Sequence, residues 1–335
     1  MSMPLQQKLA IGKYILSRRL RGEEKYALVL ELEPLLQCNL ACAGCGKISH
    51  PTDILRRRLS VEDCIRAVDE CGAPVVSIAG GEPLVHEQMP QIVQALIDRG
   101  KFIFLCTNAL LLKKKIDLFK PHVQFAWMIH LDGLKEHHDQ AVSREGVFEI
   151  AIEAIKLAKA RGFRVFTNTT FFDRDDADSI RSVLDYLNDE LKVDMMQISP
   201  AYAYEKAPDQ EHFLGVERTR EIFREAFSGG NRDRWRLNHS PVYLDFLEGK
   251  TDFECTPWGI PCYTVFGWQR PCYLMSQEPY AQTYRELIEE TDWSKYGRGK
   301  HPSCANCMAH CGYEPTAVLK TMSSVKETLR AALAN

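Results

Sequence analysis

Residues 38–45 have the sequence CNLACAGC, which places three cysteines, Cys38, Cys42 and Cys45, within one short loop. The segment follows the apolar run 26–32, which has the composition of a buried β-strand. In α/β barrels the loops after the strands carry the chemistry, so the thiols are expected in a functional loop. Three thiolates this close suit an iron–sulfur cube and leave one iron with an open coordination position. The alternatives are a zinc loop, although structural zinc normally takes four ligands, and unpaired structural thiols.

The chain around this loop alternates between short apolar runs and stretches with helical periodicity. The predicted strands are residues 26–32, 75–79, 102–106, 125–130, 164–170 and 195–198. The predicted helices are residues 61–70, 89–99, 110–119, 148–160 and 177–191. Because strands that alternate with helices form parallel sheets, we predict an α/β protein with an open, partial (β/α)6 barrel.

The composition is that of an ordinary folded protein, with 335 residues, of which 45% are hydrophobic and 26% charged. The sequence has neither a run of about 18 apolar residues nor the pattern of a signal peptide, so a cytoplasmic protein is expected. The net charge of −3 creates no basic field for nucleic acid. We therefore predict no nucleic-acid partner.

Three segments are predicted along the chain. Residues 1–24 form a basic amphipathic segment, residues 25–200 the partial barrel, and residues 201–335 a cysteine-rich C-terminal extension. Nine of the 12 cysteines lie in three sequence clusters. In a chain without a secretion signal, such clusters favour metal binding over disulfide bonds.

A second motif, GGEP at residues 80–83, ends the second predicted strand. Together with the cysteine spacing, it resembles the motifs of the radical S-adenosylmethionine (radical SAM) superfamily. The resemblance implies a 4Fe–4S cluster on Cys38, Cys42 and Cys45, whose open iron binds S-adenosylmethionine and cleaves it reductively to a 5′-deoxyadenosyl radical. The chain departs from the pattern at Gly44, where the superfamily often has an aromatic residue that contacts the adenine.

The resemblance also implies which residues contact S-adenosylmethionine. They are Gly80, Gly81, Glu82, Pro83, Asn108 and Asp132. The GGEP motif would hold the methionyl amino group, with Glu82 in a structural or hydrogen-bonding role, while Asn108 and Asp132 would contact the ribose or the carboxylate. Without the resemblance, GGEP is a strand-terminal turn, and Asn108 and Asp132 are ordinary strand-end residues.

Cys106 lies two residues before Asn108, so the two side chains share one face of the third strand. If Asn108 lines the cofactor cavity, Cys106 is expected there too. A thiol has a weak S–H bond and is suited to give a hydrogen atom to a carbon radical, which makes Cys106 the candidate catalytic residue. The alternative is a buried structural cysteine, the commoner fate of a free thiol.

The extension contains a second group of cysteines, and its spacing resembles the auxiliary-cluster extensions of some radical SAM enzymes. The candidate ligands of a second metal site are Cys255, Cys272, Cys304, Cys307 and Cys311. Cys262 would be a spare thiol. Zinc, or no metal at all, is the alternative, because a small loop-rich region can use zinc equally well.

Over nearly its whole length the chain resembles the radical SAM enzymes that form adenosylhopane in bacterial hopanoid biosynthesis. The resemblance is carried by QCNLACAGCGK (37–47), TNTT (167–170) and TPWG (256–259). It implies addition of the deoxyadenosyl radical to the terminal alkene of diploptene, with Cys106 as the reductant of the resulting carbon radical. It also implies an electron donor such as a flavodoxin or ferredoxin. Phe104, Trp127, Phe171 and Phe172 are candidates for an apolar substrate cavity or for the core.

The basic segment 1–24 has two interpretations. Its apolar residues are partly at helical spacing among Lys and Arg, which suits peripheral contact with an anionic membrane surface. It is equally suited to dock on the barrel. Two alternatives remain for the whole protein: another radical SAM enzyme with an auxiliary cluster, acting on a peptide or small molecule, and a zinc-binding protein without radical chemistry.

Overall fold

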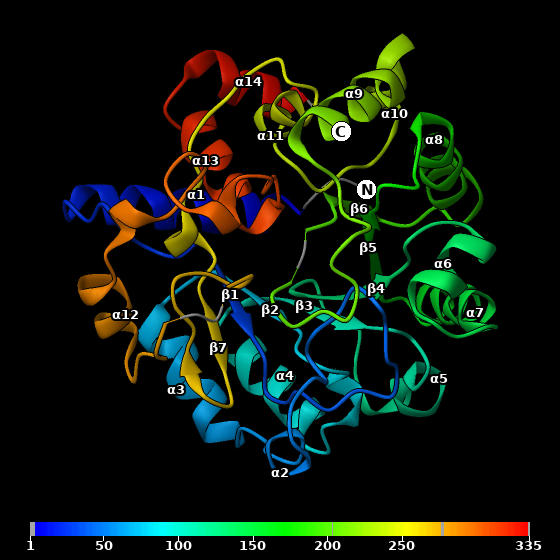
Figure 1. Ribbon diagram of the computed structural model, residues 1–335. Coiled ribbons are helices and arrows are strands. Elements are labelled where there is room, and N and C mark those ends of the chain that lie inside the picture. The colour runs from blue at the N-terminus through cyan, green and yellow to red at the C-terminus, as the bar shows by residue number, and fades with distance from the viewer. Residues whose placement is uncertain (1–3, 203, 276–277, 334–335) are drawn as a thin grey trace.

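The computed structural model describes residues 4–202, 204–275 and 278–333, with an eight-stranded sheet at its centre (Figure 1). The strand order is β6-β5-β4-β3-β2-β1-β7-β8. The strands are β1 (Val29–Leu32), β2 (Val75–Ile78), β3 (Phe102–Thr107), β4 (Phe125–His130), β5 (Arg164–Phe171), β6 (Met195–Pro200), β7 (Cys262–Thr264) and β8 (Gly267–Trp268). Strands β1 to β6 are parallel and neighbour one another in chain order, as the prediction of a partial (β/α)6 barrel requires. The predicted fold class is confirmed.

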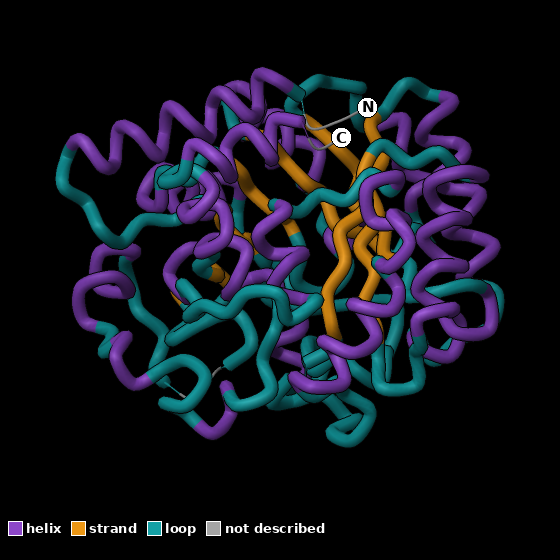
Figure 2. Tube along the Cα trace, turned by 90° about the horizontal axis from the view of Figure 1, so that it is seen from above, coloured by secondary structure: helices purple, strands orange, loops and turns teal. Residues whose placement is uncertain are grey.

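The helices surround the sheet, and strands and helices alternate as predicted (Figure 2). Those of the barrel region are α1 (Leu5–Leu20), α2 (Thr52–Leu55), α3 (Val61–Cys71), α4 (Met89–Asp98), α5 (Leu112–Lys115), α6 (Lys135–Ala141), α7 (Val147–Ala160) and α8 (Ala177–Asp185). Those of the extension are α9 (Val216–Ala226), α10 (Asn231–Arg234), α11 (Pro241–Leu247), α12 (Tyr284–Glu290), α13 (His310–Thr321) and α14 (Val325–Leu333). Local signals fix their ends: Ser60 caps α3 in a capping box with Asp63, and Gly72 ends α3 at a positive φ.

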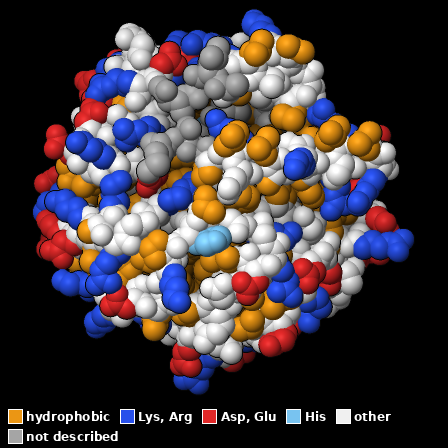
Figure 3. Space-filling model, turned by 180° about the vertical axis from the view of Figure 1, so that it is seen from behind, with side chains coloured by type: hydrophobic (Ala, Val, Ile, Leu, Met, Phe, Trp, Pro, Cys, Tyr) orange, Lys and Arg blue, Asp and Glu red, His pale blue; other side chains and the backbone are white. Residues whose placement is uncertain are grey.

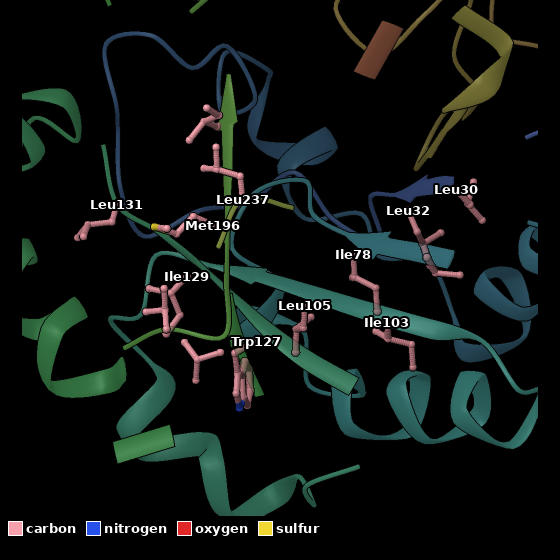
Figure 4. Close-up of a cluster of buried hydrophobic side chains, with 14 of the residues drawn as sticks. Leu30, Leu32, Ile78, Ile103, Leu105, Trp127, Ile129, Leu131, Met196 and Leu237 are labelled. Carbon is pink, nitrogen blue, oxygen red and sulfur yellow. The ribbon is translucent and has the colours of Figure 1, made fainter. Parts of the chain in front are cut away.

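Alternate residues of each strand face opposite sides of the sheet, and the outward side forms the main core. Figure 4 shows Leu105, Trp127 and Ile129 on this side, packed among other buried apolar residues. Each such side chain contributes about 1.5–3 kcal/mol when fully buried. The inward side of the same strands carries Phe104, Cys106 and Met128, so the period of two separates the core from the barrel interior.

The extension contributes β7 and β8 to the sheet, which the sequence did not indicate. Strand β7 runs parallel to β1, with Glu31 N–H donating to Pro261 O over 2.9 Å and Glu33 N–H donating to Tyr263 O over 2.8 Å. Strand β1 would otherwise be an unpaired edge of the barrel, and β7 satisfies its backbone groups. The three-residue run of β7 is too short to be recognised by periodicity.

The amphipathic segment 1–24 contains one long helix, α1, while residues 1–3 lie outside the described residues. Ala10 and Ile11 of α1 pack against the apolar residues of the barrel interior, including Phe104 and Met128. The helix therefore docks on the barrel, as one of the two interpretations requires. Among the described residues, no helix has the length and apolar character needed to cross a membrane.

Candidate active site

One cavity of about 420 Å³ lies inside the barrel, at the ends of the parallel strands. Its wall contains Cys38, Cys42, Cys45, Gly80, Gly81, Glu82, Cys106, Asn108 and Asp132. The structure thus brings together nearly all the site residues that the sequence indicated in the barrel. Pro83 is buried beside them as the first residue of a short 3₁₀ helix.

The three thiols of the cysteine loop face this cavity as free, half-buried groups. A turn closes the loop, with Cys45 N–H donating to Cys42 O over 3.1 Å. Burial raises the pKa of Cys38 to about 11, and burial together with the neighbouring Cys45 and Cys38 raises the pKa of Cys42. Thiols that oppose one another's ionisation in this way are stabilised as thiolates by a shared cation.

A buried ion pair holds the chain just after the third thiol. Lys47 Nζ lies 2.7 Å from Glu33 Oε1, and both side chains are almost entirely buried. Burial alone would lower the pKa of Lys47, but the Glu33 carboxylate outweighs it and raises that pKa. The pair joins the end of the cysteine loop to the end of β1. No local pattern indicates it, because the two residues are 14 positions apart.

The glycines of GGEP permit close contact with the backbone before Cys38. Gly80 has φ +100°, and a Cβ there would lie 2.3 Å from Leu35 O, while a Cβ on Gly81 would lie 2.1 Å from Gln37 O. The two segments are hydrogen bonded, with Gly81 N–H donating to Leu35 O over 3.0 Å and Glu82 N–H donating to Gln37 O over 2.9 Å. These glycines therefore position the cysteine loop, because any side chain would push it away.

Glu82 ties the ends of β2 and β3 together. Its buried carboxylate accepts hydrogen bonds from Leu84 N–H (2.9 Å), the Thr107 hydroxyl (2.8 Å) and Asn108 N–H (2.8 Å). Both oxygens are used, so within the protein Glu82 has a structural role. The bond to Asn108 also brings the Asn108 amide to 3.7 Å from Cys38 Sγ, beside the first thiol.

Asp132 forms a buried pair with His130, which the sequence analysis did not single out. His130 Nε2 lies 2.6 Å from Asp132 Oδ2, and Asp132 Oδ1 accepts a hydrogen bond from Thr170 N–H over 2.7 Å. Burial alone would raise the pKa of Asp132, but His130 holds it below its usual range. Asp132 also raises the pKa of His130 against the effect of burial. His130 is the last residue of β4 and Asp132 follows two positions later, and this spacing is the signal that places both side chains on the cavity face.

Cys106 lies deeper in the same cavity, in a polar row that crosses three strands. Its Sγ lies 3.7 Å from Ser77 Oγ on β2, and Ser77 is the register partner of Glu31 on β1. Burial raises the pKa of Cys106, which keeps it as a protonated thiol. Burial and the nearby Glu33 raise the pKa of Glu31 to about 8. The sequence did not indicate Glu31 or Ser77, because a strand register has to be known before residues on neighbouring strands can be paired.

Gly44 stands where the superfamily often has an aromatic residue, and an aromatic ring from another part of the chain lies beside it. A Cβ on Gly44 would lie 3.2 Å from the ring of Phe172, which follows β5 and lines the cavity. Phe104 also lines the cavity, whereas Trp127 and Phe171 belong to the core on the other side of the sheet. Of the four candidate aromatic residues, two therefore face the interior, as their positions along the strands dictate.

The candidate second metal site lies in the extension. Cys255, Cys272, Cys304, Cys307 and Cys311 are free thiols within electrostatic range of one another. Burial raises the pKa of Cys255 to about 12, and Cys272 and Cys304 contribute to the rise. Cys262 is buried in β7 opposite Glu31 and also lies within electrostatic range of Cys272. The five proposed ligands thus lie in one region of the extension, and Cys262 lies near one of them.

The barrel cavity fits an iron–sulfur cluster and a polar ligand by its donor set. It offers three soft thiol ligands and the buried Asn168 Oδ1, which has no hydrogen-bond partner among the described residues. Within the described residues no three His, Cys, Asp or Glu side chains stand at the spacing for a single metal ion.

Comparison with known proteins agrees with this geometry. Residues 32–187 match the model of the radical SAM superfamily, and residues 196–331 match a domain of unknown function, DUF3463. GTP 3′,8-cyclase 1 of Mycobacterium tuberculosis is 29% identical over 214 residues, which cover 59% of this chain and 58% of that protein. The match thus spans little more than half of the relative's length.

Solved structures share the fold at low sequence identity. SuiB of Streptococcus suis bound to its precursor peptide SuiA has a TM-score of 0.67 and 15% identity, covering 88% of this chain and 73% of that one. anSMEcpe with bound AdoMet has a TM-score of 0.60 and 16% identity, covering 91% and 99%. The superfamily uses a 4Fe–4S cluster and S-adenosylmethionine, which confirms the predicted cofactors. The family model and the fold of these neighbours therefore support the radical SAM superfamily for residues 32–187.

Proposed function

We propose that the protein is a radical SAM enzyme that joins the 5′-deoxyadenosyl group of S-adenosylmethionine to the terminal alkene of diploptene, forming adenosylhopane. The observation that carries the proposal is a single cavity with two chemically different ends. Its polar end contains the cysteine loop, the GGEP glycines and the His130–Asp132 pair. Its other end is lined by apolar residues of the strands and of α1, such as Phe104, Met128 and Ile11.

The residues at the polar end have distinct proposed roles. Cys38, Cys42 and Cys45 hold the 4Fe–4S cluster, which when bound supplies the electron that splits S-adenosylmethionine. Gly80 and Gly81, whose backbone lines the cavity, are the proposed contacts for the methionyl end. Asn108, beside Cys38, and Asp132, at the end of β4, are the proposed polar contacts for the carboxylate or ribose. Phe172 takes the place of the aromatic residue missing at position 44 and stacks on the adenine.

The apolar end suits a hydrocarbon substrate. Val75, Phe104 and Met128 form part of its wall, beside the polar row of Glu31, Ser77 and Cys106. Cys106 is the thiol among them, and its raised pKa preserves the S–H bond. We propose that this bond breaks as the new C–H bond forms on the substrate. The thiyl radical left behind regains one electron from the reductant, a flavodoxin or ferredoxin, and one proton.

Anaerobic incubation with diploptene, S-adenosylmethionine and dithionite, followed by mass spectrometry, tests the proposal directly. We expect a product with the mass of adenosylhopane, and no product from Cys38→Ala, Cys42→Ala or Cys45→Ala. Cleavage of S-adenosylmethionine without a diploptene adduct would reject the substrate and retain the radical chemistry. Retained cleavage in any of the three variants would reject the ligand assignment.

A second candidate function is modification of a peptide or small molecule with the help of an auxiliary cluster. The gathering of five thiols in the extension favours it, because such a cluster can bind substrate or relay electrons. Iron, sulfide and zinc analysis of the anaerobically purified protein distinguishes the cases. More than four irons per chain supports a second cluster, and zinc without sulfide supports a structural zinc site. We further propose that the functional boundary between barrel and extension lies near residue 200.

A further inference from the structure

Helix α1 has an inner face on the barrel and an outer face that the described residues leave exposed. On the inner face, Gln7 and Ile15 are almost fully buried, and Gln7 and Ile11 line the cavity. On the outer face, four leucines are exposed to 70%, 53%, 57% and 79%, namely Leu5, Leu9, Leu16 and Leu20. A helix that only closed the barrel would need apolar residues on one side, so the second stripe requires another explanation.

The outer leucines are arranged as a stripe with basic borders. At 3.6 residues per turn they fall within a sector of about 60°. Exposed Lys8 and Arg19 lie on one side of this sector and exposed Lys13 on the other, and residues 5–20 contain no Asp or Glu. An apolar stripe between Lys and Arg side chains is typical of helices that lie in the plane of an anionic bilayer surface.

A second exposed apolar stripe lies beside the first, at the C-terminal end of the described chain. Met322, at the end of α13, is 39% exposed, and Val325 and Leu329 of α14 are 80% and 59% exposed. Arg19 of α1 donates hydrogen bonds to Leu319 O (3.3 Å) and Ser323 Oγ (2.9 Å), and a Cβ on Gly12 would lie 3.9 Å from Met322 Cε.

These contacts join α1 to the end of α13 and to the turn that precedes α14, and so bring the two exposed apolar groups next to each other. We call the surface that they form the α1–α14 face and define it as Leu5, Leu9, Leu16, Leu20, Met322, Val325 and Leu329. Figure 3 shows hydrophobic side chains in a row over α1, with Lys and Arg side chains beside them and a further hydrophobic group over α14.

We propose that the α1–α14 face docks on the surface of an anionic phospholipid bilayer and that α1 thereby places the apolar end of the cavity at the membrane. The Lys and Arg side chains beside the stripe favour a negatively charged surface. The exposed apolar side chains of the α1–α14 face suit the acyl region of lipids. The same helix walls the cavity through Ile11, so one element links bilayer and active site. The docking proposal depends only on the α1–α14 face, whereas the passage of diploptene past α1 rests on the proposed function.

One further detail suits α1 as the element that opens. Gln7 Oε1 is buried in the cavity wall and has no hydrogen-bond partner among the described residues. An unpaired buried amide oxygen makes the closed position of the helix less stable than full pairing would. A route between α1 and the strands would let a hydrocarbon leave the bilayer without crossing water.

Sedimentation of the full-length protein with vesicles tests the docking. We expect binding to vesicles of phosphatidylglycerol and phosphatidylcholine (3:7) and weak binding to pure phosphatidylcholine, falling with added salt. The variant Leu9→Ser/Leu16→Ser should lower the partition coefficient about tenfold or more, and Lys8→Glu/Lys13→Glu similarly. Ile150→Ser is the matched control, because Ile150 is an exposed apolar residue of α7, outside the α1–α14 face. Circular dichroism melts verify that every variant folds.

Two outcomes overturn the proposal. One is wild-type protein that fails to bind the anionic vesicles, or binds them as well after the leucine changes. The other is a concentration-dependent dimer in sedimentation velocity that the leucine changes abolish, which would assign the face to a second copy of the chain. Turnover separates docking from function: with diploptene in vesicles the leucine variant should be slowed about tenfold, and in detergent it should match wild type. Vesicle binding without any diploptene product would reject the proposed function and leave the docking intact.

Discussion

Replacement of Glu82 by glutamine tests whether this residue holds the site together. In the native protein Glu82 Oε1 accepts from Leu84 N–H and the Thr107 hydroxyl, and Glu82 Oε2 accepts from Asn108 N–H. Glutamine keeps one acceptor oxygen and places an amide N–H₂ where the other stood. Because the side chain is buried, the Asn108 N–H then faces another donor and loses its partner without access to water.

The size of the effect follows from these bonds. An unsatisfied buried donor costs about 1–3 kcal/mol, and the two bonds that remain lose the strength that a charged acceptor gave them. We expect Glu82→Gln to lower the free energy of unfolding by about 2–4 kcal/mol. Displacement of Asn108 from Cys38 should also lower the iron content after anaerobic reconstitution.

Urea unfolding of the apoprotein, followed by both tryptophan fluorescence and circular dichroism, measures this change. The matched control is Glu87→Gln, because Glu87 lies five residues further along and is exposed. The control should stay within about 0.5 kcal/mol of wild type. If Glu82→Gln also stays within that margin, the carboxylate is not the tie between β2 and β3.

Three further predictions address the cavity. Cys106→Ser should preserve cleavage of S-adenosylmethionine and lower the reduced adduct at least tenfold or change its configuration, as seen by chromatography; an unchanged product would return Cys106 to a structural role. Phe172→Ala should raise the KM for S-adenosylmethionine about tenfold with a smaller change in kcat, and an unchanged KM would refute the stacking role. The raised pKa of Glu31, about 8, means that wild-type stability should fall as the pH rises from about 4.5 to about 8, because the unfolded chain releases this proton earlier than the folded one. Glu31→Gln should remove that slope and raise the free energy of unfolding at pH 9 by about 3–5 kcal/mol over wild type, at about 1.4 kcal/mol per pKa unit. Urea unfolding at each pH measures the change. If the stabilities of the variant and of wild type depend on pH in the same way, the Glu31 carboxyl is not buried as described.

The sequence was sufficient for the parts of the fold that depend on local patterns. Strand β4, at Phe125–His130, has the bounds that the apolar run predicted, and α3 and α7 differ from prediction by one residue at an end. The predicted helix 110–119 is instead one α-helical turn followed by a 3₁₀ turn. The strand β7 was missed, because a three-residue strand is recognisable only from its partner β1.

The residues of the candidate site likewise fall into those that local patterns indicate and those that depend on the fold. The thiol loop and the GGEP glycines could be identified because both are short, specific motifs within one stretch of chain. The pair Lys47–Glu33, the row Glu31–Ser77–Cys106 and the contact of Phe172 with Gly44 join segments that are distant along the chain, so they depend on the fold. The apolar residues of α1 were visible in the sequence, but the contact of α1 with the turn before α14, through Arg19 and Ser323, required the structure.

The central claim is that Cys38, Cys42 and Cys45 hold a four-iron cluster in the barrel. Mössbauer spectroscopy of the ⁵⁷Fe-reconstituted protein in which all five candidate extension ligands are replaced by alanine tests it most directly. We expect the quadrupole doublet of one 4Fe–4S cluster per chain, perturbed on addition of S-adenosylmethionine and lost when Cys42→Ala is added. Absence of that doublet from a folded variant, or a spectrum indifferent to Cys42→Ala, would contradict the account.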